Sequence, residues 1–159
     1  MWLRMGKLNI LVFPGGTEIG MEIGKSLRYC KEINVLSASS QIVNHAPFLY
    51  NRHFFISEVT GVSWIDELNH LIQSHGIDYI FPANPFVMKA LSRNRGQIKT
   101  KIIINDKKVV ETVTSKKNTL EIFKGIIPVP RTYSYSEPVD AFPVFIKPDS
   151  AYGAQEAEL

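Results

Sequence analysis

The stretch that decides the fold is 8–20, LNILVFPGGTEIG, in which a continuous apolar run leads into a glycine-rich turn. Further short apolar runs occur along the first two thirds of the chain, at residues 33–36, 54–56, 77–81 and 102–104. Most of these runs are continuously apolar rather than alternating, which is typical of strands in a parallel sheet covered by helices on both faces. We therefore interpret each run as a strand.

Helical periodicity fills the intervals between these strands. Residues 18–31 place apolar side chains four positions apart, residues 63–75 form a second helical pattern that stops at Gly76, and residues 86–94 form a weaker one. Residues 41–52 show no helical period, so we expect irregular structure there. Alternation of strands and helices at this spacing predicts an α/β fold with an open, mostly parallel, Rossmann-like sheet.

Composition and charge restrict the class of protein. A hydrophobic fraction of 45% and a charged fraction of 21% are ordinary for a globular protein and exclude a disordered chain. The net charge of +3 is too small to require nucleic acid, and no apolar run reaches the roughly 20 residues that cross a bilayer. The single cysteine, Cys30, cannot form an internal disulfide. We predict a cytoplasmic protein that binds neither nucleic acid nor membranes.

The turn after the first strand, with Gly15, Gly16 and Thr17, is the first candidate substrate-binding site. Gly15 and Gly16 would let the backbone approach a ligand, and the helix that begins after Thr17 favours an anion at its N-terminus. The alternative is that the glycines only permit a tight turn. A nicotinamide dinucleotide is a weaker prediction, because the glycines do not match G-x-G-x-x-G and the second strand ends in serines instead of an acidic residue.

Asn84 follows the fourth strand, at a second position where open α/β sheets bind ligands. We expect it to face the same crevice as the glycine turn and to hydrogen-bond a small polar substrate. The alternative is an asparagine that only forms a turn between Pro82 and Pro85. The four histidines lack the spacing of metal ligands, so no metal site is predicted from them.

The pattern changes after about residue 106. A helix follows Ser115, a candidate N-cap, and ends near Gly125. The next segment, 126–130 (IIPVP), is an extended connector because proline cannot continue a helix. Two further strands are expected, at 131–135 and 142–147.

The segment 142–148, FPVFIKP, is the most specific in the chain. Lys147 closes an apolar strand and precedes a loop of small residues that leads to Gly153. A fixed positive charge beside an amide-rich loop suits a nucleotide phosphate. The alternative is a solvated lysine at the end of a strand.

The order of these elements resembles the ATP-grasp superfamily, particularly its carbamoyl-phosphate-synthase-like and carboxylate–amine ligase members. An α/β domain precedes a helix that opens with Lys116, and the linker 125–130 (GIIPVP), the Lys-Pro strand and a loop follow in the family's order. Two features depart from the family pattern. Ser115 stands where the family usually has aspartate, and the loop has one glycine, Gly153, instead of several.

The resemblance implies a pre-ATP-grasp domain over 1–112 and the incomplete first part of an α+β ATP-grasp domain over 113–159. It implies an ATP- and Mg-dependent ligase that activates a small-molecule carboxylate as an acyl phosphate. Lys116, Lys147 and Gly153 would bind ATP, while the Mg ligands would lie downstream.

We therefore expect the 159-residue chain to be inactive alone, and to form a homo-oligomer through exposed apolar residues beyond about Pro130. A Rossmann-type NAD(P)-binding oxidoreductase and a non-catalytic nucleotide-binding module are the rival interpretations.

Overall fold

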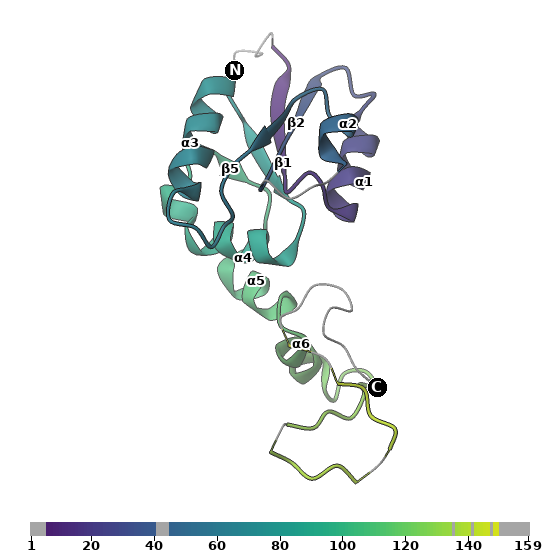
Figure 1. Ribbon diagram of the computed structural model, residues 1–159. Helices are drawn as coiled ribbons and strands as arrows, with labels where there is room; N and C mark the ends of the chain where they lie inside the picture. The colour runs from purple at the N-terminus through teal and green to yellow at the C-terminus, as the bar shows by residue number, and fades with distance from the viewer. Residues whose placement is uncertain (1–5, 41–44, 135, 141, 147, 150–159) are drawn as a thin grey trace. The chain divides into compact units, whose positions relative to one another are not determined.

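The computed structural model describes residues 6–40, 45–134, 136–140, 142–146 and 148–149. The first part of the chain forms a five-stranded parallel sheet with the strand order β3-β2-β1-β4-β5 (Figure 1). Its strands are β1 (Leu8–Phe13), β2 (Ile33–Ser39), β3 (His53–Phe55), β4 (Tyr79–Pro82) and β5 (Lys101–Ile102). The predicted α/β fold with a parallel sheet is confirmed.

Helices connect the strands, as the alternating pattern predicts. They are α1 (Glu18–Leu27), α2 (Ala46–Leu49), α3 (Trp64–His75), α4 (Pro85–Arg93) and a 3₁₀ turn over Arg95–Gln97. The prediction for α3 is accurate at its C-terminus, where Gly76 has a φ of 57° and ends the helix in the left-handed region that glycine favours. Helix α1 ends earlier than predicted, and α2 is one short turn within a segment that we expected to be irregular.

Two apolar layers cover the two faces of the sheet. The larger layer packs α3 and α4 against one face and contains Leu11, Leu36, Leu68, Ile80 and Leu91, all buried. The smaller layer packs α1 and α2 against the other face and contains Val12, Ala46, Tyr50 and Ala83. Burial on both faces explains why the strands are continuously apolar in sequence.

The chain divides into two compact units, residues 1–107 and 108–159. Helix α5 (Lys107–Val113), which the sequence did not predict, begins at this division, and α6 (Lys116–Phe123) starts after Ser115 as predicted. The domain boundary expected after residue 112 stays a prediction. No helix among the described residues is long and apolar enough to cross a membrane.

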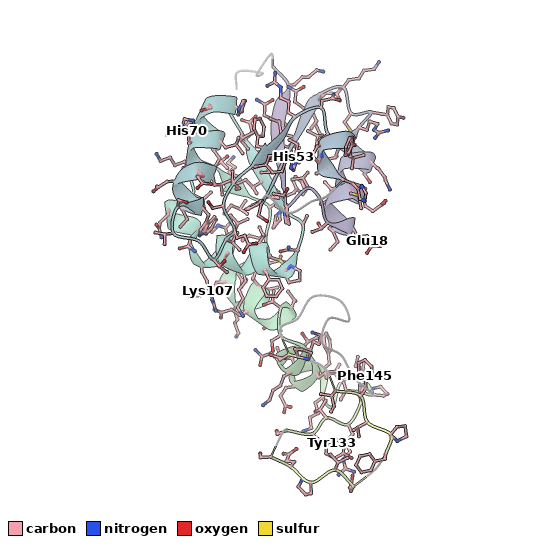
Figure 2. All side chains as sticks on the ribbon, viewed as in Figure 1. Glu18, His53, His70, Lys107, Tyr133 and Phe145 are labelled. Carbon is pink, nitrogen blue, oxygen red and sulfur yellow. The ribbon has the colours of Figure 1, made fainter. Side chains whose placement is uncertain are left out.

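The prediction of two strands at 131–135 and 142–147 is wrong for the residues that the structure describes. None of the described positions lies in a strand, only Ile146 among them forms an isolated bridge, and residues 135 and 147 lie outside the described part. Pro143 cannot donate to a ladder, and Phe142, Phe145 and Ile146 are 79%, 58% and 61% exposed. Phe145 is labelled in Figure 2. A two-stranded pairing without a covered apolar face is marginal, which accounts for the difference.

Candidate functional site

The first candidate site lies where the order of the sheet reverses. From β1 the chain moves to β2 on one side, whereas β4 pairs with β1 on the other side, with Phe13 opposite Pro82. In open α/β sheets ligands bind at such a switch point, beyond the carboxyl ends of the strands. The glycine turn follows β1 and Asn84 follows β4, so the structure brings these two predicted segments to the same place.

Thr17 connects the two segments directly. Its hydroxyl donates to the carbonyl of Ala83 at 2.9 Å and to that of Pro14 at 3.2 Å, and it accepts from the amide of Gly20 at 3.1 Å. Thr17 is therefore the N-cap of α1 and the tie between the β1 and β4 turns. The hydroxyl of Thr17 therefore has a structural role.

Gly15 is required by packing. A Cβ atom at this position would lie 2.4 Å from Cβ of Ser37 and 3.2 Å from the Tyr50 ring. The amide of Gly15 donates to the carbonyl of Ala38 at 2.9 Å, so the turn lies against the end of β2. This geometry favours the tight-turn alternative for Gly15. Gly16 is half-buried and stays a candidate for backbone contact with a ligand.

Asn84 is the N-cap of α4, and its Oδ1 accepts from the amide of Val87 at 2.7 Å. This helix-capping bond occupies the side-chain oxygen of Asn84, as expected if the residue has only a structural role. Within the described part of the chain, the Asn84 amide nitrogen makes no hydrogen bond, and the residue is half-buried. That nitrogen is the donor that a substrate acceptor could use at this edge of the sheet.

The sequence did not predict a polar cluster at the carboxyl end of β2. His53 of β3 lies opposite Ser37, and its Nδ1 is 2.7 Å from the Ser37 hydroxyl while its Nε2 is 3.0 Å from that of Ser39. Both serines are buried. Burial lowers the pKa of His53 below its usual 6.5, so its ring is neutral at pH 7. The alternating Ser37-x-Ser39 pattern is the signal that could have indicated the cluster.

Tyr50 packs against the glycine face of α1. Its hydroxyl donates to the carbonyl of Gly20, and burial raises the pKa of the phenol to about 12. A Cβ at Gly24 would lie 2.7 Å from the Tyr50 ring, so the close approach of α1 depends on this glycine as well.

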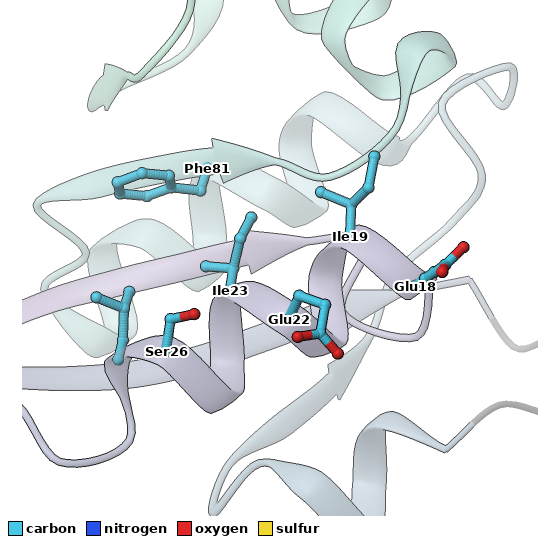
Figure 3. A pocket seen from close by; sticks show the side chains of 7 residues that line it. Glu18, Ile19, Glu22, Ile23, Ser26 and Phe81 are labelled. Carbon is cyan, nitrogen blue, oxygen red and sulfur yellow. The ribbon is translucent and has the colours of Figure 1, made fainter.

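A shallow hollow of about 510 Å³ lies between α1 and β4. Ile19 and Ile23 extend from α1 toward β4, which carries Phe81, and Glu18 and Glu22 also line the hollow (Figure 3). Its lining is mainly apolar and includes none of the residues that the sequence predicted for substrate. Among the described residues, no group of three or more His, Cys, Asp or Glu side chains could hold a metal ion.

The second candidate site lies in the second unit, at the N-terminus of α6. Ser115 caps the helix as predicted, accepting from the amide of Asn118 at 3.1 Å. The Lys116 ammonium donates to the carbonyls of Pro148 at 2.9 Å and Asp149 at 3.3 Å. The structure therefore brings Lys116 to the two residues that follow Lys147. Lys147 and Gly153, the other residues predicted to bind ATP, lie outside the described residues.

No protein-family model matches the chain, and no curated protein sequence matches it. Solved structures do match. Pyruvate carboxylase from Rhizobium etli superposes with a TM-score of 0.62 at 17% identity, over 96% of this chain and 15% of that one. Glycinamide-RNase-transformylase T from Mycobacterium tuberculosis gives 0.54 at 12% identity, over 75% and 35%. N5-carboxyaminoimidazole synthetase from Staphylococcus aureus, complexed with ADP, gives 0.53 at 13% identity, over 77% and 30%.

These matching structures are ATP-grasp family proteins. At such low identity the likeness is one of fold, and at that level the resemblance predicted from the sequence is confirmed. The α/β sheet of this chain has the architecture of the N-terminal domains of ATP-grasp proteins. The chain spans between 15% and 35% of the length of these three proteins.

Proposed function

We propose that this chain is the N-terminal portion of an ATP- and Mg-dependent ATP-grasp ligase of the carbamoyl-phosphate-synthase-like kind. In the proposed reaction a small-molecule carboxylate is activated as an acyl phosphate at the expense of ATP, and an amine or similar nucleophile then displaces the phosphate. The observation that carries this proposal is the contact of the Lys116 ammonium with the backbone of Pro148, on a chain whose fold is that of ATP-grasp proteins.

The two candidate sites take different parts in this proposal. Lys116, Lys147 and Gly153 would bind the nucleotide, because ammonium groups and backbone amides suit phosphate oxygens. The turn 15–17 and Asn84 would bind the carboxylate substrate. Gly15 and Thr17 would shape the turn, while the backbone of Gly16 and the Asn84 amide nitrogen would make the contacts.

ATP and Mg would be bound by donors of different chemistry. The Lys116 ammonium carries charged N–H groups, and phosphate oxygens accept hydrogen bonds from such groups. This residue therefore fits an ATP site. Magnesium requires oxygen ligands, typically carboxylates, and we place those ligands in segments beyond residue 159. Bound Mg would neutralise charge on the β- and γ-phosphates. The 159-residue chain should therefore show no Mg-dependent ATP hydrolysis, and robust hydrolysis would contradict this part of the proposal.

The dinucleotide-binding rival lacks support at the end of β2. An acidic residue there would bind an adenosine ribose, whereas this chain has Ser37 and Ser39 hydrogen-bonded to His53. Calorimetric titration with ATP and with NADPH separates the two functions, because it detects binding to either unit. Saturable binding of NADPH without binding of ATP would favour the oxidoreductase.

A further inference from the structure

Ser115 and Asp149 together satisfy the first three amides of α6, which no carbonyl within the helix can reach. The Lys116 amide donates to the Asp149 carbonyl at 3.2 Å, the Lys117 amide to Asp149 Oδ1 at 2.7 Å, and the Asn118 amide to the Ser115 hydroxyl. The hydroxyl in turn donates to the Asp149 carboxylate, 2.8 Å from Oδ2 and 3.1 Å from Oδ1. Two of the three amides are thus satisfied by a residue 34 positions from the N-cap.

The charges around Asp149 favour an ionised carboxylate. The first turn of α6 contains Lys116 and Lys117 and no acidic residue, and the N-terminal end of a helix itself attracts negative charge. The hydrogen bond from the Lys117 amide, with that from the Ser115 hydroxyl, holds the pKa of Asp149 below its usual 3.8. At neutral pH the carboxylate is therefore available as the anionic partner of the helix terminus.

Lys116 contacts the same short segment through its side chain. Its ammonium donates to the carbonyls of Pro148 and Asp149, while its amide donates to Asp149 as described above. Pro148 and Asp149 follow Lys147 directly in the sequence. Hydrogen bonds from both the side chain and the backbone amide of Lys116 therefore join the start of α6 to the end of the Lys-Pro motif.

We infer that Asp149 is a positioning residue, which ties the segment 148–149 to the N-terminus of α6 and so fixes Lys116 relative to the Lys-Pro motif. Its effect on nucleotide binding rests on the proposed function, whereas its effect on the structure does not. Asp149 need not contact the nucleotide itself. Its loss would release the chain that follows Lys147 and leave the Lys117 amide without its acceptor.

The first test compares Asp149→Ala with Glu121→Ala in the 159-residue chain. Glu121 is an exposed carboxylate on α6, whose contact with Lys124 is long at 3.8 Å, and it serves as the matched control. Losing a charge-assisted hydrogen bond should speed hydrogen exchange of the Lys117 amide roughly tenfold or more. Glu121→Ala should leave this rate unchanged. An unchanged rate in Asp149→Ala would overturn the inference.

A second variant separates positioning from helix capping. Ser115→Asp combined with Asp149→Ala puts a carboxylate back at the N-cap, so protection of the α6 amides should return. The ¹⁵N order parameter of residue 149 should nevertheless fall from about 0.85 to below about 0.6. If residue 149 stays ordered in this double variant, Asp149 only caps the helix and the inference fails.

ATP titration of the same variants, in a chain extended through the complete ATP-grasp domain, gives the functional outcome. Affinity for Mg-ATP should fall roughly tenfold in Asp149→Ala, stay low in the double variant and be unchanged in Glu121→Ala. If the unaltered extended chain binds no ATP, the proposed function fails while the inference is decided by exchange and order parameters alone. Unaltered ATP affinity in Asp149→Ala, with binding present, would contradict the positioning role.

Discussion

The two units of the chain are stabilised by different forces. In the first unit, apolar side chains on both faces of a parallel sheet are removed from water, and Leu11, Leu68 and Ile80 have no exposed surface. In the second unit, α6 buries no residue, and its start is secured by hydrogen bonds to Asp149. The first unit therefore contains an apolar core of its own, whereas α6 in the second depends on polar contacts between distant parts of its sequence.

The largest expected difference between the units is in their response to truncation of apolar side chains. Leu68→Ala should lower the free energy of unfolding by about 2–5 kcal/mol, because it leaves a cavity in the larger core layer. Phe145→Ala should change it by less than about 0.5 kcal/mol, because this ring is 58% exposed. Denaturant unfolding of both variants measures the contrast. Equal losses would show that the second unit has a core of its own.

Truncation of the chain gives the next test. We expect the 159-residue chain to form homo-oligomers through exposed apolar residues such as Phe142, Phe145 and Ile146, and a version ending near Asp106 to stay monomeric and folded. Sedimentation of both chains, with circular dichroism as the control for folding, measures this difference. A monomeric 159-residue chain would contradict the role given to these residues.

Within the first unit, Gly15 and Gly96 should differ in their tolerance of a side chain. Gly15→Ala should destabilise the unit by roughly 1–3 kcal/mol, because the new Cβ would overlap Ser37. Gly96→Ala is the control, since nothing lies within 4 Å of a Cβ there. Thermal unfolding compares these two variants.

Gly16→Val should lower substrate affinity more than ATP affinity, and equal losses of both would count against the substrate role of the turn.

The smallest effects, and the ones that depend on pH, should appear in different ranges for His53 and Asp149. His53 has a folded pKa below 6.5, so the unfolded chain binds more protons as pH falls through 6.5, and the first unit should lose stability there. The pKa of Asp149 is below 3.8, so its contribution is present above pH 3.8 and is lost as pH falls through the folded value. Unfolding curves from pH 7.5 to 3 measure both losses of stability. The variant His53→Gln should remove the loss that occurs as pH falls through 6.5.

The sequence predicts the first unit better than the second because the signals are local there. Continuous apolar runs identify the strands, and Gly76 marks the end of α3. The strand prediction at 142–147 is wrong because an apolar run specifies a strand only when a partner and a covered face are available. Polar contacts between distant residues also depend on a partner that the local sequence does not show.

Residues that act through tertiary contacts could not be found from local patterns. The hydrogen bonds of His53 depend on the register of β2 with β3, and the bonds between Ser115 and Asp149 join positions 34 residues apart. Thr17 and Asn84 were correctly located as residues at the ends of strands. The bond of Thr17 to Ala83 becomes visible only when β1 and β4 are adjacent, whereas the bond of Asn84 to Val87 is a local helix cap.

The most direct test of the account is the affinity for Mg-ATP of Lys147→Ala in a chain extended through the complete ATP-grasp domain. Loss of one charge-assisted contact with phosphate is worth roughly 1.5–3 kcal/mol, so calorimetry should show binding weakened tenfold or more. Lys25→Ala is the matched control, because Lys25 pairs with Glu22 on the exposed face of α1 and should not affect ATP. ATP affinity and turnover that are unchanged in Lys147→Ala would contradict the nucleotide role on which the proposed function depends.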